Sequence, residues 1–276
     1  MAILVTGATG NVGSELVAAL LADGHAVRAL VRGERPAGLP AQARAIRGDF
    51  NDPASLADGL AGAESLFLMP GYADMPGIAA QAKAAGVARI VLLSGNSAGG
   101  RDDNAVSAYM NRSEAAVRES GVPYTFLRPF GFMSNTLRWL DQLKAGDVVR
   151  EPFATVPIAV LDPADIAAVA AAALTSPDHE GQIYRLSGPE ALLPADRLRI
   201  LGEVLGRDLR LEPMSNEEAR ISLSAQMPAE YVDAFFQFYV DGTIDESTPQ
   251  PTVQEVLGRA PRTFLDWATA HADAFR

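Results

Sequence analysis

Short apolar runs alternate with amphipathic stretches along the first half of the chain, a pattern that predicts strands and helices in turn. Six apolar runs have the length and side chains of buried parallel strands, at residues 2–5, 25–31, 43–47, 65–69, 89–93 and 123–127. Helical periodicity follows at 12–23, 53–60, 75–85 and 105–120. Strands that alternate with helices in this way predict an α/β fold whose sheet is parallel and doubly wound, with right-handed crossovers.

The second half has a weaker pattern. Residues 158–174 begin like a strand and become a helix near Asp162-Pro163, where Asp162 and Asp165 are interpreted as helix caps. Residues 182–186 resemble a strand that returns to the main sheet, and helices are predicted at 193–205 and over the tail at 262–268. We therefore expect a doubly wound parallel Rossmann domain over 1–150, to which later strands return, and a smaller C-terminal α+β lobe over 151–276.

One helix of this lobe, within residues 227–240, is rich in aromatic side chains. Residues 231, 235, 238 and 239 share one helical face, which is typical of core packing. Phe235 and Phe236 point in different directions, however, so one of them could reach a crevice. Together with Phe130, Phe132 and Met133 it would then line a flat aromatic site.

Composition excludes several classes of function. The 276 residues carry a net charge of −11, which argues against nucleic-acid binding, and they include no cysteine, so disulfides and thiolate catalysis are excluded. The three histidines are far apart in sequence, and no metal site is expected. The longest apolar stretch, 166–174, is too short to span a bilayer, and nothing resembling a signal peptide precedes the first strand. A cytoplasmic enzyme without membrane contact is predicted, and a homodimer is allowed for.

A glycine-rich turn lies between the first predicted strand and helix and reads Thr-Gly-Ala-Thr-Gly-Asn-Val-Gly over 6–13. In a dinucleotide-binding unit the first glycine permits the tight turn, the second lets the pyrophosphate approach the backbone, and the third permits close packing. Free N–H groups at the helix start would then meet the phosphates. A strand-to-helix turn that merely favours glycine is the alternative. The predicted cofactor contacts in this turn are Gly7, Thr9, Gly10, Asn11, Val12 and Gly13.

The end of the second strand decides which nucleotide is expected. An NAD site usually has an acid there, which binds the ribose 2′-OH, whereas this chain has Arg32, with Arg35 close by. A guanidinium suits a 2′-phosphate, so NADP(H) is favoured over NAD(H). Glu34 is the competing residue that would favour NAD(H), and an exposed surface role for Arg32 is the other alternative.

Further residues follow the carboxyl ends of the strands, where ligands bind in such sheets. Asp49, followed by Phe50, could accept a hydrogen bond from an adenine amino group, or could act as a helix cap or turn residue. The other residues expected around the same crevice are Met69, Pro70, Ser94, Gly95 and the segment 128–130.

Together these motifs resemble the atypical short-chain reductases of the NmrA-like type. The resemblance covers about residues 1–190 and depends on the turn at 6–13, on Gly48-Asp49, and on the segments 120–129, 132–135 and 161–166. It implies an NADPH-dependent oxidoreductase in a family that includes quinone reductases, reductases of aromatic natural products and inactive cofactor sensors. It also implies that Met69-Pro70 and Ser94-Gly95 flank the nicotinamide, and that the residues after the sixth strand begin the substrate side. Phe130, at this junction, is expected to contact the cofactor.

The chain departs from its relatives at the usual proton donors. Related short-chain enzymes use Tyr-x-x-x-Lys, but here Tyr109 is followed by Ser113 at the lysine position. Many NmrA-like relatives have a lysine or histidine where Met110 stands. Arg112 could anchor a ribose or phosphate, but a guanidinium is too weak an acid for proton transfer. Tyr109 is the remaining candidate acid, with helix packing as its alternative role.

Three hypotheses of function follow. The first is an NADPH-dependent reductase acting on a small quinone or aromatic polyketide-like carbonyl, because hydride transfer to such an acceptor needs little acid assistance. The second is a non-catalytic protein that senses NADP. The third is an enzyme that uses the same fold for a non-redox step.

Overall fold

The central sheet matches the predicted α/β class. The computed structural model describes residues 2–49, 51–101 and 103–276. Over these residues one sheet has the order β3-β2-β1-β4-β5-β6-β8, and every pairing in it is parallel. The strands are β1 Ala2–Val5, β2 Ala26–Val31, β3 Arg44–Arg47, β4 Ala63–Leu68, β5 Arg89–Leu93, β6 Tyr124–Pro129 and β8 Ile183–Leu186. The strand order reverses between β1 and β4, which is where a doubly wound sheet binds its ligand.

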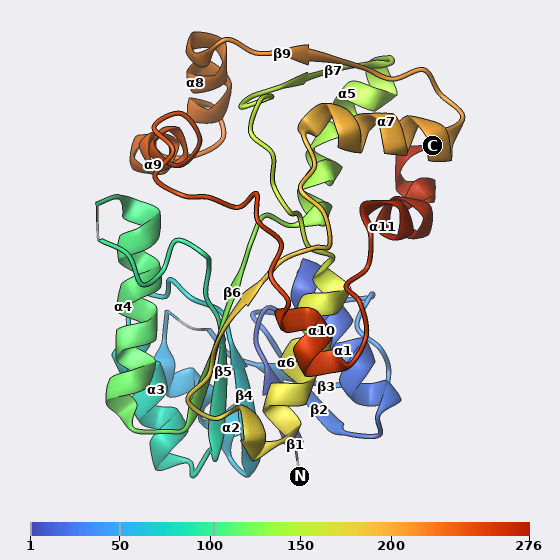
Figure 1. Ribbon diagram of the computed structural model, residues 1–276. Helices are drawn as coiled ribbons and strands as arrows, with labels where there is room; N and C mark the ends of the chain where they lie inside the picture. Colours follow the sequence, from blue (N-terminus) through green and yellow to red (C-terminus); the bar gives the residue numbers. More distant parts are fainter. Residues whose placement is uncertain (1, 50, 102) are drawn as a thin grey trace.

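Helices cover both faces of this sheet (Figure 1). One face carries α1 (Asn11–Ala22), α6 (Pro163–Thr175) and α10 (Thr252–Leu257). The opposite face carries α2 (Ala57–Leu60), which follows the 3₁₀ turn η1 (Pro53–Leu56), together with α3 (Met75–Ala84) and α4 (Ala105–Ser120). Each face therefore buries its own apolar cluster, which is why strands with two buried sides read as continuous apolar runs.

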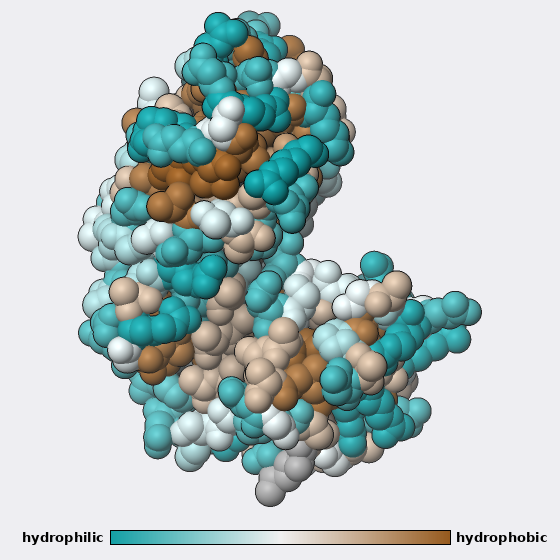
Figure 2. All heavy atoms as spheres, turned by 90° about the vertical axis from the view of Figure 1, so that its right-hand side faces the viewer, coloured by the Kyte–Doolittle hydropathy of each residue, from teal (hydrophilic) through white to brown (hydrophobic). Residues whose placement is uncertain are grey.

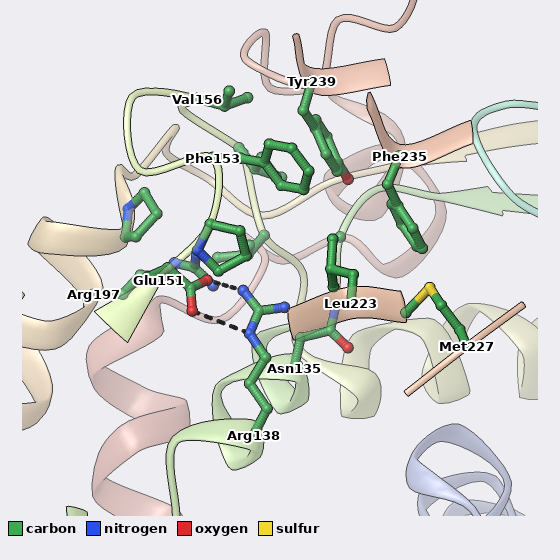
Figure 3. A pocket seen from close by; sticks show the side chains of 15 residues that line it. Asn135, Arg138, Glu151, Phe153, Val156, Arg197, Leu223, Met227, Phe235 and Tyr239 are labelled. Carbon is green, nitrogen blue, oxygen red and sulfur yellow. Dashed lines mark hydrogen bonds and ion pairs between the residues drawn. The ribbon is translucent and has the colours of Figure 1, made fainter. Parts of the chain in front are cut away.

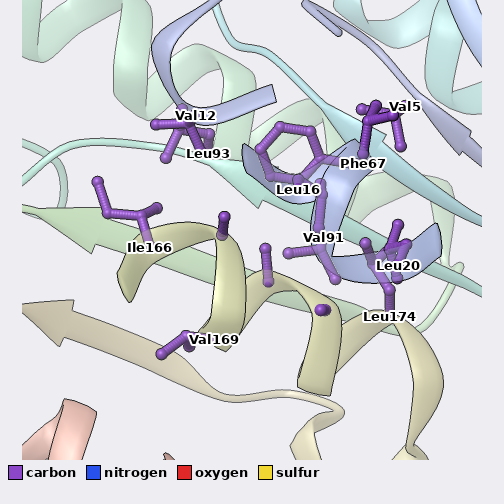
Figure 4. Packing of buried hydrophobic residues seen from close by; sticks show 14 of the residues in the cluster. Val5, Val12, Leu16, Leu20, Phe67, Val91, Leu93, Ile166, Val169 and Leu174 are labelled. Atoms are coloured by element: carbon purple, nitrogen blue, oxygen red, sulfur yellow. The ribbon is translucent and has the colours of Figure 1, made fainter. Parts of the chain in front are cut away.

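The packing of α1 against α6 shows how an alanine-rich segment contributes to the core. Leu16 and Leu20 of α1 are fully buried and lie near Ile166 and Leu174 of α6 (Figure 4). The small alanines of α6 let the two helices approach closely over the sheet. The helix begins at Pro163, and its cap is Asp162, whose side chain accepts a 2.9 Å hydrogen bond from the N–H of Ala164.

The interpretation of Asp165 as a second cap is wrong. Its carboxylate is fully buried and accepts a 2.7 Å hydrogen bond from the Arg262 backbone N–H. It also forms a 2.8 Å ion pair with Arg259. Asp165 therefore holds the C-terminal segment against α6, a contact between residues far apart in sequence that no local pattern indicates.

The strand expected just before α6 is reduced to isolated bridges. Ile158 pairs with Leu192, and Leu161 pairs with Phe132. This segment joins the small lobe to the end of β6 and does not enter either sheet.

The smaller lobe lies above the sheet in Figure 1. It contains η2 (Met133–Trp139), α5 (Leu140–Ala145), α7 (Pro194–Leu205), α8 (Asn216–Ser224), α9 (Ala229–Tyr239), α11 (Phe264–Ala270) and η4 (Ala272–Phe275). Strands β7 (Val148–Glu151) and β9 (Arg210–Pro213) form a parallel pair there. Trp139, Phe264 and Trp267 are fully buried and anchor its core. The sequence pattern does not predict α5, β7, β9, α8 or α10.

The chain crosses between the two parts more than once. It enters the lobe after β6, returns to the sheet with α6, the 3₁₀ turn η3 (Pro177–His179) and β8, and lies against the sheet again at α10. The predicted return of residues 182–186 to the main sheet is confirmed by the pairing of β8 with β6. A division near residue 150 stays a prediction.

Candidate functional site

The turn between β1 and α1 has the geometry of a phosphate cradle. Gly7 has a φ of +59°, and the Gly10 N–H donates a 2.9 Å hydrogen bond to the Gly7 carbonyl. Helix α1 begins at Asn11 with Gly10 as its N-cap, and no side chain caps it. Its first N–H groups and the positive end of its dipole are therefore available to an anion.

The three glycines of the turn have different neighbours. A Cβ at Gly13 would lie 2.1 Å from the Gly7 carbonyl oxygen, so this position must be glycine for the turn to pack on the helix. A Cβ at Gly10 would meet the same oxygen at 3.3 Å and nothing else within 4 Å. The space in front of Gly10 is open, as a bound pyrophosphate requires.

A hollow beside this turn is lined by residues from the ends of the first strands. It brings Arg32 together with Gly7, Thr9 and Asp49, which the sequence predicts, and also with Tyr72, which it does not. Burial raises the pKa of the Tyr72 hydroxyl, while Arg32 lowers it and Asp49 raises it. Glu34 lines the same hollow, and the predicted contact Phe50 lies outside the described residues.

Asp49 also has the turn role that the sequence allows for. Its Oδ1 accepts a 2.9 Å hydrogen bond from the Asn51 N–H, and its own N–H donates to the Ser55 hydroxyl at 2.8 Å. One carboxylate oxygen therefore shapes the loop after β3. A contact with an adenine amino group stays a prediction.

Arg32 and Arg35 have different environments although they are close in sequence. Arg35 donates hydrogen bonds to the carbonyls of Ala43 at 2.8 Å and Leu39 at 2.9 Å, so its guanidinium stabilises its own loop. Arg32 is exposed and lines the hollow. Of the two arginines, Arg32 is therefore the one available to a 2′-phosphate.

The ends of β4 and β5 lie at the same edge of the sheet as the phosphate turn, because these strands run parallel to β1. The Met69 N–H donates a 2.9 Å hydrogen bond to the Thr6 hydroxyl, and a Cβ at Gly7 would lie 3.0 Å from the Met69 side chain. Pro70 follows Met69 along the chain. At the end of β5, a Cβ at Gly95 would lie 3.1 Å from the Met110 methyl group, so this methionine packs on the loop. An apolar side chain thus occupies this position beside the end of β5.

The hydroxyl of Ser94 belongs to a buried network. It donates a 2.7 Å hydrogen bond to Glu114 of α4, whose side chain is almost fully buried. Arg128 binds the same carboxylate through two nitrogens, at 2.8 and 2.6 Å. The serine hydroxyl therefore stabilises a buried ion pair.

Tyr109 lies away from this network, on the side of α4 that faces the end of β4. A Cβ at Gly71 would lie 3.3 Å from its ring. The ring packs edge-to-face on Tyr231 of α9, with centroids 6.3 Å apart. Burial, and to a smaller extent Tyr231, raises the pKa of its hydroxyl. Ser113, four residues after Tyr109, donates to the Tyr109 carbonyl at 2.8 Å and accepts from the Gly71 N–H at 3.0 Å.

Tyr109 and Arg112 line a shallow hollow between α3 and α4, together with Tyr72. Phe130, at the end of β6, is 2% exposed, and the Arg185 guanidinium lies 5.3 Å from the centre of its ring. The roles of Tyr109, Arg112 and Phe130 stay predictions.

A cavity of about 220 Å³ extends from the end of β6 into the small lobe (Figure 3). Gly131, just beyond β6, forms part of one wall, and Phe153, Phe235 and Tyr239 supply aromatic walls. The other apolar lining residues are Pro152, Val156, Ile158, Val160, Pro194, Leu223 and Met227. In the space-filling view, a deep notch separates this lobe from the sheet domain (Figure 2).

The aromatic side chains only partly follow the sequence prediction. Phe235 reaches the cavity, whereas Phe236 is 8% exposed and packs edge-to-face on Phe153, with centroids 5.3 Å apart. Met133 is buried in the lobe core, and Phe132 packs against the core of the sheet. The aromatic wall is therefore built from Phe235, Tyr239 and Phe153, the last of which the sequence does not predict.

Charged side chains line the same cavity. Glu151 is 2% exposed and accepts hydrogen bonds from Arg138, through Nε at 3.3 Å and through Nη2, and from the Trp139 Nε1–H at 2.8 Å. Arg197 of α7 is 4% exposed, and burial followed by the charge of Arg138 lowers its pKa to about 10. Asn135 is the other polar lining residue.

A second buried carboxyl group, Glu246, lies behind the wall formed by Gly131 and Tyr239. It accepts a 3.2 Å hydrogen bond from the Gly131 N–H, and burial raises its pKa to about 7. Burial also raises the pKa of Tyr239, and the charge of Glu246 raises it further. At neutral pH this part of the wall therefore holds a phenol and a partly protonated carboxyl group.

Comparison with known proteins identifies the family. Residues 7–177, more than half of the chain, match the family described as NAD(P)H-binding. The chain belongs to this NAD(P)H-binding family. Among the described residues no group of three or more potential ligands could hold a metal ion, and no helix is long and apolar enough to cross a membrane.

Several similar proteins are reductases. The chain is 43% identical to the (4-alkanoyl-5-oxo-2,5-dihydrofuran-3-yl)methyl phosphate reductase of Streptomyces griseus, over 99% of both chains. It is 33% identical to the NAD(P)H azoreductase of Xenophilus azovorans, again over 99% of both. The solved NADPH-dependent quinone oxidoreductase of Escherichia coli is 25% identical, with a TM-score of 0.79 over 97% of this chain and 98% of that one. The predicted resemblance to NmrA-like reductases is confirmed, and the protein is an NAD(P)H-dependent oxidoreductase.

Sequence reasoning missed the charged residues of the cavity, Arg138, Glu151 and Arg197, the carboxyl group of Glu246 behind its wall, and also Tyr72. The one local signal is that Arg197 shares a helix face with the buried residues Pro194 and Leu201. The other residues come together only when β7, α7 and the segment after α9 fold over the end of β6.

Proposed function

We propose that this oxidoreductase uses NADPH to reduce a small electron-poor conjugated carbonyl compound, such as a quinone or an aromatic polyketide-like carbonyl. The observation that carries the proposal is the aromatic-walled cavity, one of whose lining residues is Gly131, just beyond the carboxyl end of β6. A flat conjugated acceptor fits between Phe153, Phe235 and Tyr239. The names of the similar proteins support this class, since one is a quinone oxidoreductase and another is a reductase of an alkanoyl-substituted dihydrofuranone carrying a methyl phosphate group.

The residues present fit the cofactor. The uncapped start of α1 and the open space before Gly10 accommodate the pyrophosphate, and Arg32 supports a preference for the 2′-phosphate of NADPH. When bound, NADPH supplies a hydride. The chain's own contribution is to hold the acceptor against the crevice and to exclude water from it.

The absence of a Tyr–Lys pair is consistent with this acceptor class. Ser94 is engaged with Glu114, Ser113 stands at the lysine position, and Tyr109 has a raised pKa. An ordinary ketone needs a proton as it accepts hydride, because a localised alkoxide forms. A conjugated acceptor spreads the charge over several atoms, so positioning and electrostatics suffice.

Steady-state oxidation of NADPH and NADH tests the proposal. The panel contains 1,4-naphthoquinone, an acylated butenolide and cyclohexanone. We expect turnover of the two conjugated acceptors with NADPH, at least tenfold slower turnover with NADH, and none with cyclohexanone. Efficient reduction of cyclohexanone alone would overturn the assignment to conjugated acceptors.

A further inference from the structure

Arg197 is a buried cation that the protein leaves incompletely paired. It is 4% exposed, lines the small-lobe cavity, and its Nε has no hydrogen-bond partner among the described residues. No ion pair found in the described part of the chain includes it, and its guanidinium instead lies 5.5 Å from the centre of the Trp139 ring. A buried charge without a partner is expensive, so such a group usually has a partner in the functional state.

The carboxylate nearest to this arginine is already engaged. One oxygen of Glu151 binds Arg138 Nη2, and the other accepts from Arg138 Nε and from the Trp139 indole N–H. Arg138 and Arg197 together carry two positive charges, and Glu151 neutralises one of them. This end of the cavity is therefore electropositive, which attracts an anion.

The remaining walls indicate what else the anion must carry. Apart from these charged residues and Asn135 the lining is mainly apolar and aromatic, and it includes Phe153, Leu223, Met227 and Phe235 (Figure 3). Phe153 has a φ of +53°, a strained conformation for a residue with a side chain, and its ring lies against Phe236 and Tyr239 at 5.3 Å each. A strained residue in the wall indicates a cavity shaped for a ligand.

We infer that this cavity binds an amphiphilic substrate through an oxyanion, a phosphate monoester in preference to a carboxylate, held by Arg197 with Arg138. This inference rests on the proposed function and specifies its substrate class. A planar guanidinium binds phosphate or carboxylate through paired hydrogen bonds, and a phosphate offers three acceptor oxygens for two arginines. The acceptor carbonyl then lies toward Gly131, and the apolar walls hold the alkyl or aromatic part.

The test uses matched acceptors that differ in one substituent. The probes are an acylated butenolide with a hydroxymethyl group, its phosphate ester, and the analogue with a carboxymethyl group. We expect the wild type to favour the phosphate ester over the alcohol by about 100-fold in kcat/KM, from charge-assisted hydrogen bonds to the arginines, with the carboxylate in between. Equal values for phosphate ester and alcohol would overturn the inference, and a higher value for the carboxylate would overturn the preference for phosphate.

Arg197→Met removes the charge while keeping much of the length of the side chain. We expect it to reduce the phosphate-to-alcohol ratio at least tenfold. The matched control is Arg199→Met, on the same helix, where an exposed arginine pairs with Glu203 at 2.7 Å. This control is expected to leave the ratio and the activity unchanged. An unchanged ratio in Arg197→Met would show that other residues cause the preference for phosphate, and it would overturn the proposed binding of the anion by Arg197.

A binding measurement separates this inference from the proposed function. The ligand is the phosphate ester in which the carbon–carbon double bond of the butenolide ring has been reduced, so it cannot accept a hydride there. Calorimetric titration of this ligand into protein that is fully loaded with NADP⁺ measures binding at the anion site without turnover. We expect the dissociation constant to rise at least tenfold in Arg197→Met and not in Arg199→Met. Lack of turnover with every conjugated acceptor, combined with this binding pattern, would contradict the proposed function alone. Binding of equal strength to wild type and Arg197→Met would contradict the anion site alone.

A structural role for Arg197 predicts a different outcome. If its charge stabilised the fold, Arg197→Met would lower the melting temperature. For a buried charge that has no ion-pair partner of its own in the fold, we expect the melting temperature of the ligand-free variant to be equal to or higher than that of the wild type. A lower melting temperature together with an unchanged dissociation constant would assign Arg197 to the fold.

Discussion

The hydroxyl of Ser94 donates a 2.7 Å hydrogen bond to the buried carboxylate of Glu114, and this relationship ties the end of β5 to α4. Because the same carboxylate is bound by Arg128, the serine acts as part of a structural ion-pair network. We expect Ser94→Ala to lower the free energy of unfolding by about 1.5–3 kcal/mol, the usual contribution of a hydrogen bond to a charged group. Urea denaturation measures this loss.

The effect of Ser94→Ala on catalysis distinguishes a structural serine from a catalytic one. We expect kcat to fall by less than about tenfold, since the hydroxyl points to Glu114, whereas a general acid or its direct partner usually contributes about 10²–10⁴-fold. A fall of that size with unchanged stability would mean that Ser94 leaves Glu114 during the reaction.

The glycines of the phosphate turn are expected to respond differently to substitution. Gly10→Val places its side chain in the open space where the pyrophosphate is expected, so cofactor binding is lost while the fold is retained. Gly13→Ala puts a Cβ 2.1 Å from the Gly7 carbonyl oxygen, so it destabilises the protein by about 1–3 kcal/mol or more. Fluorescence titration with NADPH and thermal unfolding measure the two effects. Unchanged NADPH affinity in Gly10→Val would refute the assignment of the turn.

Cofactor preference is expected to depend on Arg32. Arg32→Ala should weaken NADPH binding by about 1.5–3 kcal/mol while leaving NADH binding nearly unchanged, because only NADPH carries the 2′-phosphate. Arg35→Ala is the matched control, since Arg35 bonds to the carbonyls of its own loop and is expected to affect stability more than cofactor choice. Dissociation constants for both cofactors decide the question. An equal loss of affinity for NADPH and for NADH in Arg32→Ala would show that Arg32 does not bind the 2′-phosphate.

Tyr109→Phe is expected to retain turnover within about tenfold, less than the 10²–10⁴-fold that a general acid usually contributes. Its hydroxyl has a pKa raised by burial, and Ser113 stands where a lysine would lower it, so it is poorly suited to proton transfer. The measurement is NADPH oxidation with 1,4-naphthoquinone, with Arg112→Ala compared in parallel. A thousandfold fall in kcat with unchanged NADPH affinity would restore Tyr109 as the general acid and contradict a mechanism based on positioning.

Glu246 is expected to make stability depend on pH. Burial raises the pKa of this carboxyl to about 7 in the folded protein from 4.5, so the folded state binds its proton more tightly than the unfolded state does. The contribution of Glu246 to the free energy of unfolding is fully present below pH 4.5, and it is lost as the pH rises to about 7. The neutral variant Glu246→Gln should therefore match the wild type near pH 4.5 and be more stable at pH 8, by up to about 3 kcal/mol. A difference between the two proteins that does not change with pH would contradict the raised pKa.

The fold and the cofactor half of the site are predictable because their signals are local. Strand length, helix periodicity and the glycine spacing at 6–13 all lie within short segments. The parallel direction of the strands then follows from their alternation with helices, and the crossovers between them are right-handed. Because the carboxyl ends of parallel strands meet at one edge, the sequence alone predicts that Gly7, Arg32, Asp49, Met69 and Ser94 lie around one crevice, and the structure gathers Gly7, Arg32 and Asp49 in one hollow.

The substrate half is less predictable because its residues come from distant segments. Phe153 lies in the loop after β7, a short strand of a two-stranded sheet, whose pattern is too brief to recognise. The aromatic helix α9 is expected from the sequence, but its orientation decides that Phe235 faces the cavity while Phe236 is buried. Periodicity can assign side chains to faces of a helix, yet it cannot say which face meets a cavity.

By itself the sequence determined the fold class and the NAD(P)H cofactor, and it predicts the phosphate turn and the loss of the usual proton donors, since each depends on residue type and spacing along the chain. Only the tertiary structure decided that Ser94 donates a hydrogen bond to Glu114, and that Arg138, Arg197 and Glu151 line one cavity in the small lobe. Those relationships depend on burial and on contacts between residues that are far apart along the chain. The free energy of burying a charge depends on the partners that the fold brings to it, and a linear pattern does not contain those partners.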